Sequence, residues 1–333
     1  MTHKDAILLV NLGSPDSTSI PDIKRYLAEF LMDKYVIDLP WPLRAAIVYG
    51  PILTFRPKKT SAAYKSVWTK SGSPLIQISK GLQKKVLEKL DKPVYLAMRY
   101  GNPSIPDVIN AIKKEKPDLK SLTVIPLYPQ YAMSTTLTVE KAVKKAAKEL
   151  NFKAKINFKS AFYNDPDYIN ALVQSAKKQL DGAEHILFSY HGLPERHLRK
   201  TDPGSHCTSE ACCDTASDAW KTCYKHQAKV TSDLFMQILG KEISYSIAFQ
   251  SRLGPDKWIS PSTEDEIIRL GETGKKNIHV ICPSFVADCL ETLEEINMEG
   301  RETFLEHGGE SFTYIPCLNT TEAWVDTVVK WCK

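Results

Sequence analysis

Short apolar segments with strand character alternate along this chain with longer segments of helical periodicity, and this alternation restricts the possible folds more than any other feature. Eight segments carry the β-branched, aliphatic and aromatic residues typical of strands. They are Ala6–Leu12, Val94–Tyr100, Leu122–Tyr128, Lys155–Ser160, His185–His191, Ser244–Phe249, Ile278–Phe285 and Ser311–Pro316. Because most of them are apolar along their whole length, they predict parallel sheets covered by helices on both faces.

Helical patterns lie between most of these strands, and four strands fall in each half of the chain. The helical segments are Pro74–Leu90, Ile105–Lys116, Thr135–Leu150, Pro166–Leu180, Thr215–Leu239 and Ser262–Gly271. A chain of 333 residues also exceeds the usual size of a single core. We therefore predict an α/β fold of two similar Rossmann-like domains with parallel four-stranded sheets. We expect them at residues 1–160 and 161–318, with 319–333 forming a helix that packs back.

Composition and charge exclude several functional classes. With 44 basic and 39 acidic residues the net charge is only +5, and the lysine runs coincide with helical patterns, so we expect no nucleic-acid partner. No glycine-rich motif for dinucleotides or phosphates is present. The apolar run Ala6–Val10 is too short for a signal peptide, and no run reaches the ~18 residues of a membrane span. These observations predict a cytoplasmic protein without structural disulfides.

Ligands of open parallel sheets bind beyond the carboxyl ends of the strands, so the residues that follow each strand are candidates for function. The second set of strands is followed by Ser189-Tyr190-His191-Gly192, Gln250-Ser251-Arg252 and Pro283-Ser284-Phe285. An imidazole at a strand end can act as a base near neutral pH. His191 is therefore either a catalytic base or a structural histidine bonded to a neighbouring loop, and position alone does not separate the two.

A second candidate is the acidic segment that follows the strand Ile278–Phe285. On an ideal α-helix, Asp288, Glu291, Glu295 and Glu299 form one stripe opposite the apolar residues. The pattern by itself favours a solvated face of an amphipathic helix. The alternative is a file of carboxylates that lines a cavity, binds a divalent cation and accepts protons.

The segment Tyr35–Phe55 is rich in large apolar residues but is interrupted by prolines and by Arg44, so it cannot span a membrane. It is either part of the core or an exposed apolar lip that binds a flat apolar ligand or contacts a bilayer.

Four of the eight cysteines, Cys207, Cys212, Cys213 and Cys223, lie in one segment with the spacing C-x4-C-C-x9-C. Four thiolates can hold a tetrahedral metal or a [2Fe–2S] cluster, and His206 and His226 flank the segment as possible substitutes. Spacing alone leaves an iron–sulfur cluster, zinc and free thiols open.

Six motifs resemble, in order, the signatures of the ferrochelatase family, whose members insert Fe²⁺ into a porphyrin to make haem. They are "LLVNLGSPDS", "RYGNPS", "IPLYPQYAMSTT", "SYHGLPER", "FQSRLGPDKWISPSTED" and "CPSFVADCLETLEEI", and they cover the chain from about residue 6 to residue 318. The resemblance implies two Rossmann-like domains with the porphyrin in a cleft between them. It implies that His191 and Glu291 are catalytic, and that Asp288 and Glu295 belong to a path for iron and protons on a helix with π-type turns.

The resemblance also implies a set of substrate contacts. Asn11, Leu12, Arg99, Tyr100 and Trp258 match positions around the macrocycle, whereas Arg56, Tyr64 and Ser73 match positions near its propionates. Leu43 and its neighbours match an apolar lip that faces the membrane, which implies a peripheral membrane association. The oligomeric state is not predicted.

Some members of the family carry a [2Fe–2S] cluster, and the resemblance favours Cys207, Cys212, Cys213 and Cys223 as its ligands in this chain. Many relatives have a histidine where this chain has Cys289, which weakens any mechanism that needs two histidines. Cys282 and Cys317 are expected in the core.

The expected substrate is protoporphyrin IX, because relatives that metallate coproporphyrin often have a tyrosine near the end of the first strand, where this chain has Asn11 and Leu12. The alternatives are a coproporphyrin III ferrochelatase, a cobalt or nickel chelatase, and a porphyrin or haem carrier without turnover.

Overall fold

The computed structural model describes residues 4–207, 211–252, 254 and 256–333, and the chain forms two compact units. Unit 1 comprises Met1–Leu127, Met133–Ser160 and Val328–Lys333. Unit 2 comprises Tyr128–Ala132 and Ala161–Thr327. The chain therefore passes between the units more than once, and each unit is described by itself below.

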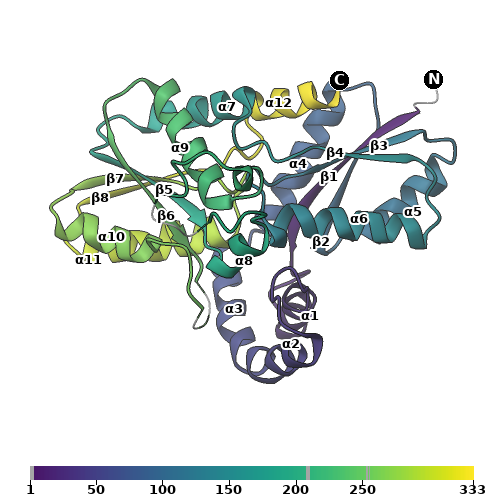
Figure 1. Ribbon diagram of the computed structural model, residues 1–333, viewed down its shortest axis with the longest axis horizontal. Coiled ribbons are helices and arrows are strands. Elements are labelled where there is room, and N and C mark those ends of the chain that lie inside the picture. The colour runs from purple at the N-terminus through teal and green to yellow at the C-terminus, as the bar shows by residue number, and fades with distance from the viewer. Residues whose placement is uncertain (1–3, 208–210, 253, 255) are drawn as a thin grey trace. The chain divides into compact units, whose positions relative to one another are not determined.

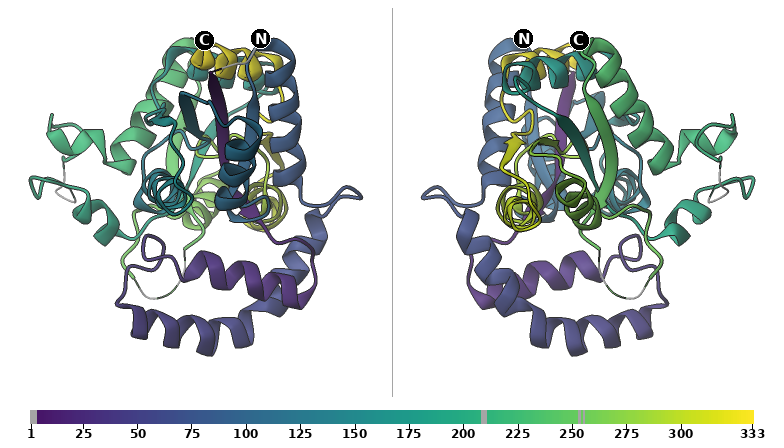
Figure 2. Two further views of the ribbon diagram at one scale, coloured as in Figure 1. Left: turned by 90° about the vertical axis from the view of Figure 1, so that its right-hand side faces the viewer. Right: turned by 90° about the vertical axis from the view of Figure 1, so that its left-hand side faces the viewer.

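Unit 1 is built on a parallel four-stranded sheet with the strand order β2-β1-β3-β4 (Figure 1). The strands are β1 (Asp5–Ser14), β2 (Val94–Gly101), β3 (Ser121–Pro126) and β4 (Lys155–Phe158). The helices are α1 (Ile20–Leu31), α2 (Trp41–Ile47), α3 (Leu53–Val67), α4 (Pro74–Lys89), α5 (Ile105–Glu115) and α6 (Thr138–Glu149), with short π-helices η1 (Val48–Ile52) and η2 (Met133–Leu137). Figures 1 and 2 show α1, α2 and α3 beyond the carboxyl end of β1, away from the sheet.

Unit 2 repeats the same topology, with the strand order β6-β5-β7-β8. Its strands are β5 (His185–His191), β6 (Ser244–Gln250), β7 (Asn277–Ile281) and β8 (Ser311–Ile315). The helices are α7 (Pro166–Ala176), α8 (Glu195–Lys200), α9 (Tyr224–Leu239), α10 (Thr263–Glu272) and α11 (Arg301–Glu306), with the π-helix η5 (Glu291–Gly300) and the 3₁₀-helices η3 (Lys177–Gln179) and η4 (Asp218–Lys221). The final helix α12 (Glu322–Cys332) begins in unit 2 and ends in unit 1.

The core of unit 2 explains why η5 stays in place. Side chains of all four strands pack with α10, η5 and α11, and the contacts include Ile267 of α10, Ile296 of η5 and Phe304 of α11. Each of these three side chains is at most 1% exposed. Burying an aliphatic or aromatic side chain stabilises a fold by about 1.5–3 kcal/mol, so η5 is anchored by its apolar side chains.

The predicted fold class is confirmed, since all eight predicted strands are present and both sheets are parallel with four strands. The predicted helix Thr215–Leu239 was wrong in its first part. That region contains η4 and a turn, and α9 starts only after Cys223, which is its N-cap. None of the helices within the described ranges combines the length and the apolarity needed to cross a membrane.

Candidate active site

His191 is the last residue of β5, and the chain turns sharply directly after it. The backbone N–H of Gly192 donates to the carbonyl of Gln250 at 2.7 Å, and a Cβ atom at Gly192 would lie 2.6 Å from that same oxygen. Only glycine fits this close approach. The backbone N–H of His191 donates to Ser284 Oγ at 3.1 Å, so the strand end is held from two neighbouring loops.

The imidazole of His191 is half-buried, and its Nδ1 atom is buried without a hydrogen-bond partner. Phe285 stacks on the ring, with centroids 6.2 Å apart and planes 14° from parallel. Burial lowers the pKa of His191 below its ordinary value of 6.5, while the nearby Glu291 carboxylate and a backbone hydrogen bond with Gly192 offset this only in part. Burial therefore favours the neutral form of the ring, the form that can accept a proton.

Gln250 ends β6 beside His191 in the strand register, and its side chain joins three parts of the site. The Oε1 atom accepts from Ser189 Oγ at 2.7 Å. The Nε2 atom donates to the carbonyl of Glu291 at 2.9 Å and lies 3.4 Å from Oε2 of Glu295. The histidine strand and the first turn of η5 are thus linked through one buried side chain.

The acidic segment forms a π-helix rather than an α-helix, as the family resemblance implied. A π-helix has more residues per turn than the ideal α-helix from which the acidic stripe was predicted, so the positions of these side chains are taken from the structure. Asp288 precedes the helix altogether, and Glu299 is exposed. Gln250 contacts the backbone carbonyl of Glu291 and the carboxylate of Glu295.

Glu295 is held by Ser251, whose backbone N–H donates to Oε1 at 2.6 Å and whose hydroxyl donates to Oε2. Burial raises the pKa of Glu295 to about 7, although the Ser251 hydrogen bonds favour the charged form. Ser251 adopts a positive φ of 64°, which turns both donors toward the carboxylate. Glu295 can therefore change its protonation state near neutral pH.

Asp288 is buried and its carboxylate is surrounded by donors. Tyr314 Oη and the N–H of Cys317 donate to Oδ1 at 2.5 and 3.1 Å, and Asn319 Nδ2 donates to Oδ2 at 2.6 Å. These bonds tie the start of the η5 segment to the loop after β8. They favour a structural role for Asp288.

Cys282, Cys289 and Cys317 are buried, and the expectation that Cys282 and Cys317 lie in the core is confirmed. Cys289 lies against the Glu291 side chain, and burial raises the pKa of its thiol well above the ordinary value, with further contributions from Glu291. Trp258 packs on Gly192, since a Cβ there would lie 3.3 Å from the indole ring. Unit 2 thus brings Trp258 next to Gly192, the Glu291 charge close to His191, and the Glu295 carboxylate to Gln250.

The other predicted substrate contacts lie in unit 1. Asn11 is buried in β1, and its amide donates to Ser79 Oγ at 3.0 Å while its Oδ1 accepts from the N–H of Leu12. Arg99 and Tyr100 end β2, and the Tyr100 side chain is fully buried. Arg56 is exposed on α3, whereas Tyr64 on α3 and Ser73 before α4 are buried.

Cysteines 207, 212, 213 and 223 lie close together in a segment that extends from the sheet of unit 2 (Figure 2). The Cys223 sulfur is in hydrogen-bonding contact with Cys213 and Cys207. The contact with Cys213 makes the largest contribution and, together with the others, lowers the pKa of Cys223 to about 6, although burial acts in the opposite direction. His206 and His226 each direct one ring nitrogen to a cysteine carbonyl, those of Cys212 and Cys213. Residues 208–210 of this segment lie outside the described part of the chain.

No group of three or more His, Cys, Asp or Glu side chains within the described ranges is arranged to hold a single metal ion. Within the cysteine segment, Cys223 interacts with both Cys207 and Cys213, and Cys213 also interacts with Cys212.

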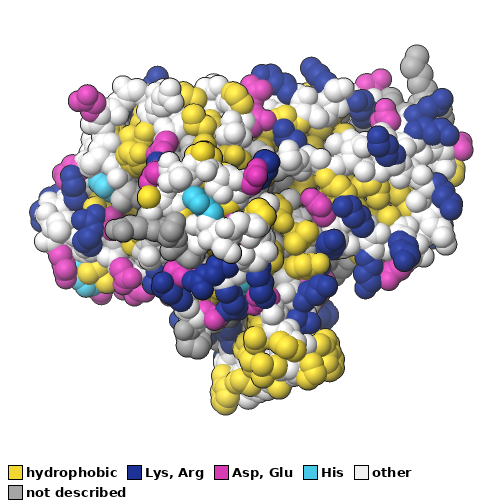
Figure 3. All heavy atoms as spheres, in the orientation of Figure 1, with side chains coloured by type: hydrophobic (Ala, Val, Ile, Leu, Met, Phe, Trp, Pro, Cys, Tyr) yellow, Lys and Arg dark blue, Asp and Glu magenta, His cyan; other side chains and the backbone are white. Residues whose placement is uncertain are grey.

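The segment Tyr35–Phe55 exposes its large apolar side chains, so the alternative that it belongs to the core is wrong for these residues. Trp41, Leu43, Tyr49 and Phe55 are 65, 51, 60 and 77% exposed. Figure 3 shows hydrophobic side chains gathered over this part of unit 1. We call these four residues the apolar lip.

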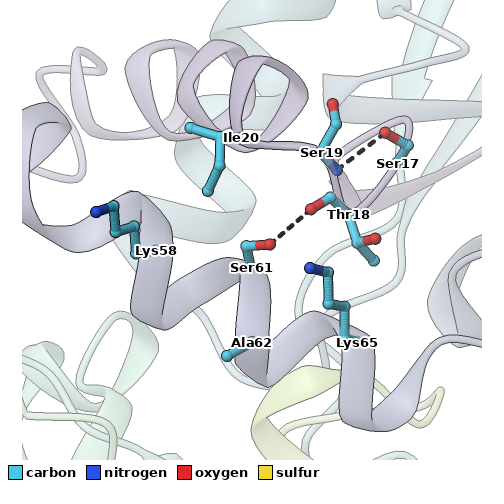
Figure 4. Close-up of a pocket in the computed structure, with 8 residues that line it drawn as sticks. All are labelled: Ser17, Thr18, Ser19, Ile20, Lys58, Ser61, Ala62 and Lys65. Carbon is cyan, nitrogen blue, oxygen red and sulfur yellow. Dashed lines mark hydrogen bonds between the residues drawn. The ribbon is translucent and has the colours of Figure 1, made fainter.

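A surface pocket of about 480 Å³ lies between the start of α1 and α3 in unit 1 (Figure 4). It is lined by Ser17, Thr18, Ser19, Ile20, Lys58, Ser61, Ala62 and Lys65. None of the residues predicted from the sequence lines it, and we assign no function to it.

Comparison with known proteins decides the family. The model of the ferrochelatase family matches residues 4–333. A ferrochelatase of Stutzerimonas stutzeri (strain A1501) is 47% identical and covers 99% of this chain and 97% of its own length. A ferrochelatase of Pseudomonas fluorescens (strain Pf0-1) is also 47% identical, covering 98% and 97%. The chain belongs to the ferrochelatase family.

The family gives the reaction. The chain is a metal chelatase, a lyase, which inserts ferrous iron into a porphyrin in haem biosynthesis. Among solved structures, SirB from Bacillus subtilis with Fe³⁺ matches with a TM-score of 0.56 at 11% identity, covering 98% of this chain and 94% of that one. That likeness supports the fold alone.

The sequence did not predict the buried polar residues whose hydrogen bonds hold the candidate functional segments. Gln250 and Ser251 were noted only as a strand end, and nothing in the sequence linked them to the acidic segment. Asp33, which contacts Arg99 and Tyr100, carried no signal, because it follows a helix that the sequence pattern did not reveal.

Proposed function

We propose that His191, Glu291 and Glu295 carry out the proton and metal transfers of iron insertion. The observations that support this most are the contacts at the end of β5. Gln250 donates to the backbone carbonyl of Glu291 and lies beside the carboxylate of Glu295, and the Glu291 charge acts on the His191 ring. Insertion replaces two pyrrole N–H protons by Fe²⁺. His191 accepts one of these protons, Glu291 accepts the other, and Glu295, with its pKa of about 7, passes protons on to solvent.

The carboxylates are also the weak oxygen ligands that suit a metal ion in transit. In this proposal Glu291 and Glu295 are transient ligands of the substrate iron, and His191 can ligate it as well. Asp288 instead positions the start of η5, because its oxygens are already used by Tyr314, Cys317 and Asn319.

We assign porphyrin contacts to residues of both units, following the family motifs. Leu12, Arg99 and Trp258 are proposed to contact the macrocycle. Asn11 and Tyr100 are buried and hydrogen-bonded, so they support neighbouring contacts. Arg56, Tyr64 and Ser73 are proposed to serve the propionates, with the exposed guanidinium of Arg56 as the charged group.

The proposed porphyrin is protoporphyrin IX. The end of β1 offers the small or aliphatic side chains of Asn11 and Leu12 rather than a tyrosine. The preference is tested by comparing insertion into protoporphyrin IX and coproporphyrin III under anaerobic conditions, and a higher kcat/KM for coproporphyrin III would contradict it.

We predict that His191→Ala lowers kcat for Fe²⁺ insertion at least about 100-fold at saturating substrates, since a positioned base contributes about 10²–10⁴ in rate. A matched control is His307→Gln, which removes a half-buried imidazole bonded to the Thr303 carbonyl and should retain its activity. Near-normal insertion by His191→Ala would contradict the assignment.

We further propose that Cys207, Cys212, Cys213 and Cys223 bind a [2Fe–2S] cluster. Four thiols gathered in one segment, with Cys223 already inclined to the thiolate form, fit a cofactor held by thiolates. The cluster supplies no electrons to the insertion step, which involves no redox change, so its role is structural or sensory.

The cluster is tested on protein purified without oxygen. We expect visible absorption and acid-labile sulfide from the native chain and their loss in Cys213→Ser, whereas Cys332→Ser, which changes the buried cysteine of α12, should retain both. A native protein without visible absorption and without acid-labile sulfide would exclude the cluster.

Finally, we propose that the apolar lip makes a peripheral contact with membranes. Phe55 of the lip lies about one helical turn before the exposed Lys58 and Lys59 on α3, and exposed apolar side chains beside lysines suit an anionic bilayer surface. This contact would bring an apolar substrate such as protoporphyrin IX close to the enzyme.

For the lip, we expect Trp41→Ala with Phe55→Ala to weaken binding to vesicles of phosphatidylglycerol and phosphatidylcholine at least about tenfold, because two aromatic side chains are lost from the interface. Leu87→Ala on α4, which removes another exposed apolar side chain, is the control. Equal flotation of native protein and double variant would refute membrane contact through the lip.

A further inference from the structure

One carboxylate in unit 1 holds the end of β2. Asp33 follows α1, and its side chain is only 5% exposed. Its Oδ2 atom forms an ion pair with Nη2 of Arg99 and accepts hydrogen bonds from Tyr100 Oη at 2.9 Å and from Thr138 Oγ1. Arg99 Nε in turn donates to Thr138 Oγ1 at 2.8 Å. The four residues form a closed network of charge-assisted bonds.

This network fixes the orientation of the Arg99 guanidinium. The side chain is 18% exposed, and the guanidinium carbon lies 4.3 Å from the centre of the Tyr100 ring. Two of its nitrogens, Nε and Nη2, are engaged by Thr138 and Asp33. Arg99 is therefore held from one side and packed on the Tyr100 ring. No acceptor for its Nη1 atom is recorded among the described residues, so this atom is left for a ligand.

The same aspartate also fixes the chain that leads into the apolar lip. Its Oδ1 atom accepts from the N–H of Tyr35 at 2.8 Å, and its carbonyl accepts from the N–H groups of Val36 and Ile37 at 3.0 Å each. Further along, buried Arg44 donates to the carbonyl of Ile37 at 3.1 Å. One residue thus connects the end of β2 with the first turn after α1.

We propose that Asp33 is a positioning residue for porphyrin binding, which acts by holding Arg99 in the orientation that contacts the substrate. The inference rests on the proposed function, in which Arg99 is a porphyrin contact. Loss of the carboxylate would leave a largely buried guanidinium without its counter-ion and free to rotate away from the Tyr100 ring. Losing the carboxylate would therefore weaken porphyrin binding, whereas the proton transfers at His191 would be unaffected.

The experiment measures porphyrin Kd by fluorescence titration, kcat and KM for insertion, and the melting temperature, for Asp33→Asn, Thr138→Val, Arg99→Met and the double variant of Asp33→Asn with Arg99→Met. We expect Asp33→Asn to raise Kd and KM for porphyrin about tenfold while kcat changes less than about threefold. Thr138→Val, a milder change that keeps the ion pair, should raise Kd about threefold. In the Arg99→Met background, Asp33→Asn should raise the porphyrin Kd by a further factor of less than about two.

Asp107→Asn is the matched control, because Asp107 accepts from Ser104 at the start of α5 and should bind porphyrin normally. If Asp33→Asn and Thr138→Val lower the melting temperature but leave Kd unchanged while Arg99→Met weakens binding, the positioning role is overturned and the Arg99 contact stands. If Arg99→Met itself binds porphyrin normally, the proposed Arg99 contact fails and the inference fails with it. If Asp33→Asn raises the porphyrin Kd as much in the Arg99→Met background as in the native enzyme, then Asp33 does not act through Arg99 and the inference is overturned.

Discussion

The hydrogen bonds of Gln250 hold together the groups on which the chemistry of unit 2 depends. Its carbonyl receives the N–H of Gly192, its Oε1 receives the hydroxyl of Ser189, and its Nε2 donates to the carbonyl of Glu291. A buried amide that makes these bonds in one orientation cannot rotate without leaving donors and acceptors unsatisfied, at a cost of about 1–3 kcal/mol for each group. His191 and the first turn of η5 therefore keep a fixed relation.

The two units use their common topology in a similar way. In each sheet the functional side chain stands at the carboxyl end of a strand, His191 on β5 and Arg99 on β2, where ligands of parallel sheets bind. In unit 1 the buried carboxylate of Asp33 holds Arg99 directly, whereas in unit 2 the buried side chain of Gln250 links Ser189 of β5 to η5. The strands place the functional side chains, and the buried polar partners fix the segments that surround them.

The sequence predicted most of the fold, because continuous apolar strands leave few alternatives to parallel sheets between helices. It did not predict α1 to α3, where Pro42, Pro51 and Pro57 obscured the pattern although prolines are tolerated in first turns and at π-helical kinks. Helical periodicity assumed α-geometry for the acidic segment, whereas η5 is a π-helix and Asp288 precedes it. Motif resemblance located His191 and Glu291, but long-range bonds such as those of Gln250 and Asp33 leave no local signature.

The most direct test of the account is the rate of iron insertion by Gln250→Leu, which keeps the volume of the side chain and removes its hydrogen bonds. Gln83→Leu, which removes a glutamine bonded to the Val94 carbonyl in unit 1, is the control. The account predicts that kcat of the folded Gln250→Leu enzyme falls at least about tenfold while porphyrin Kd stays within about twofold, because catalytic groups lose their alignment. A kcat equal to that of the control would contradict the view that Gln250 aligns His191 with the carboxylates of η5.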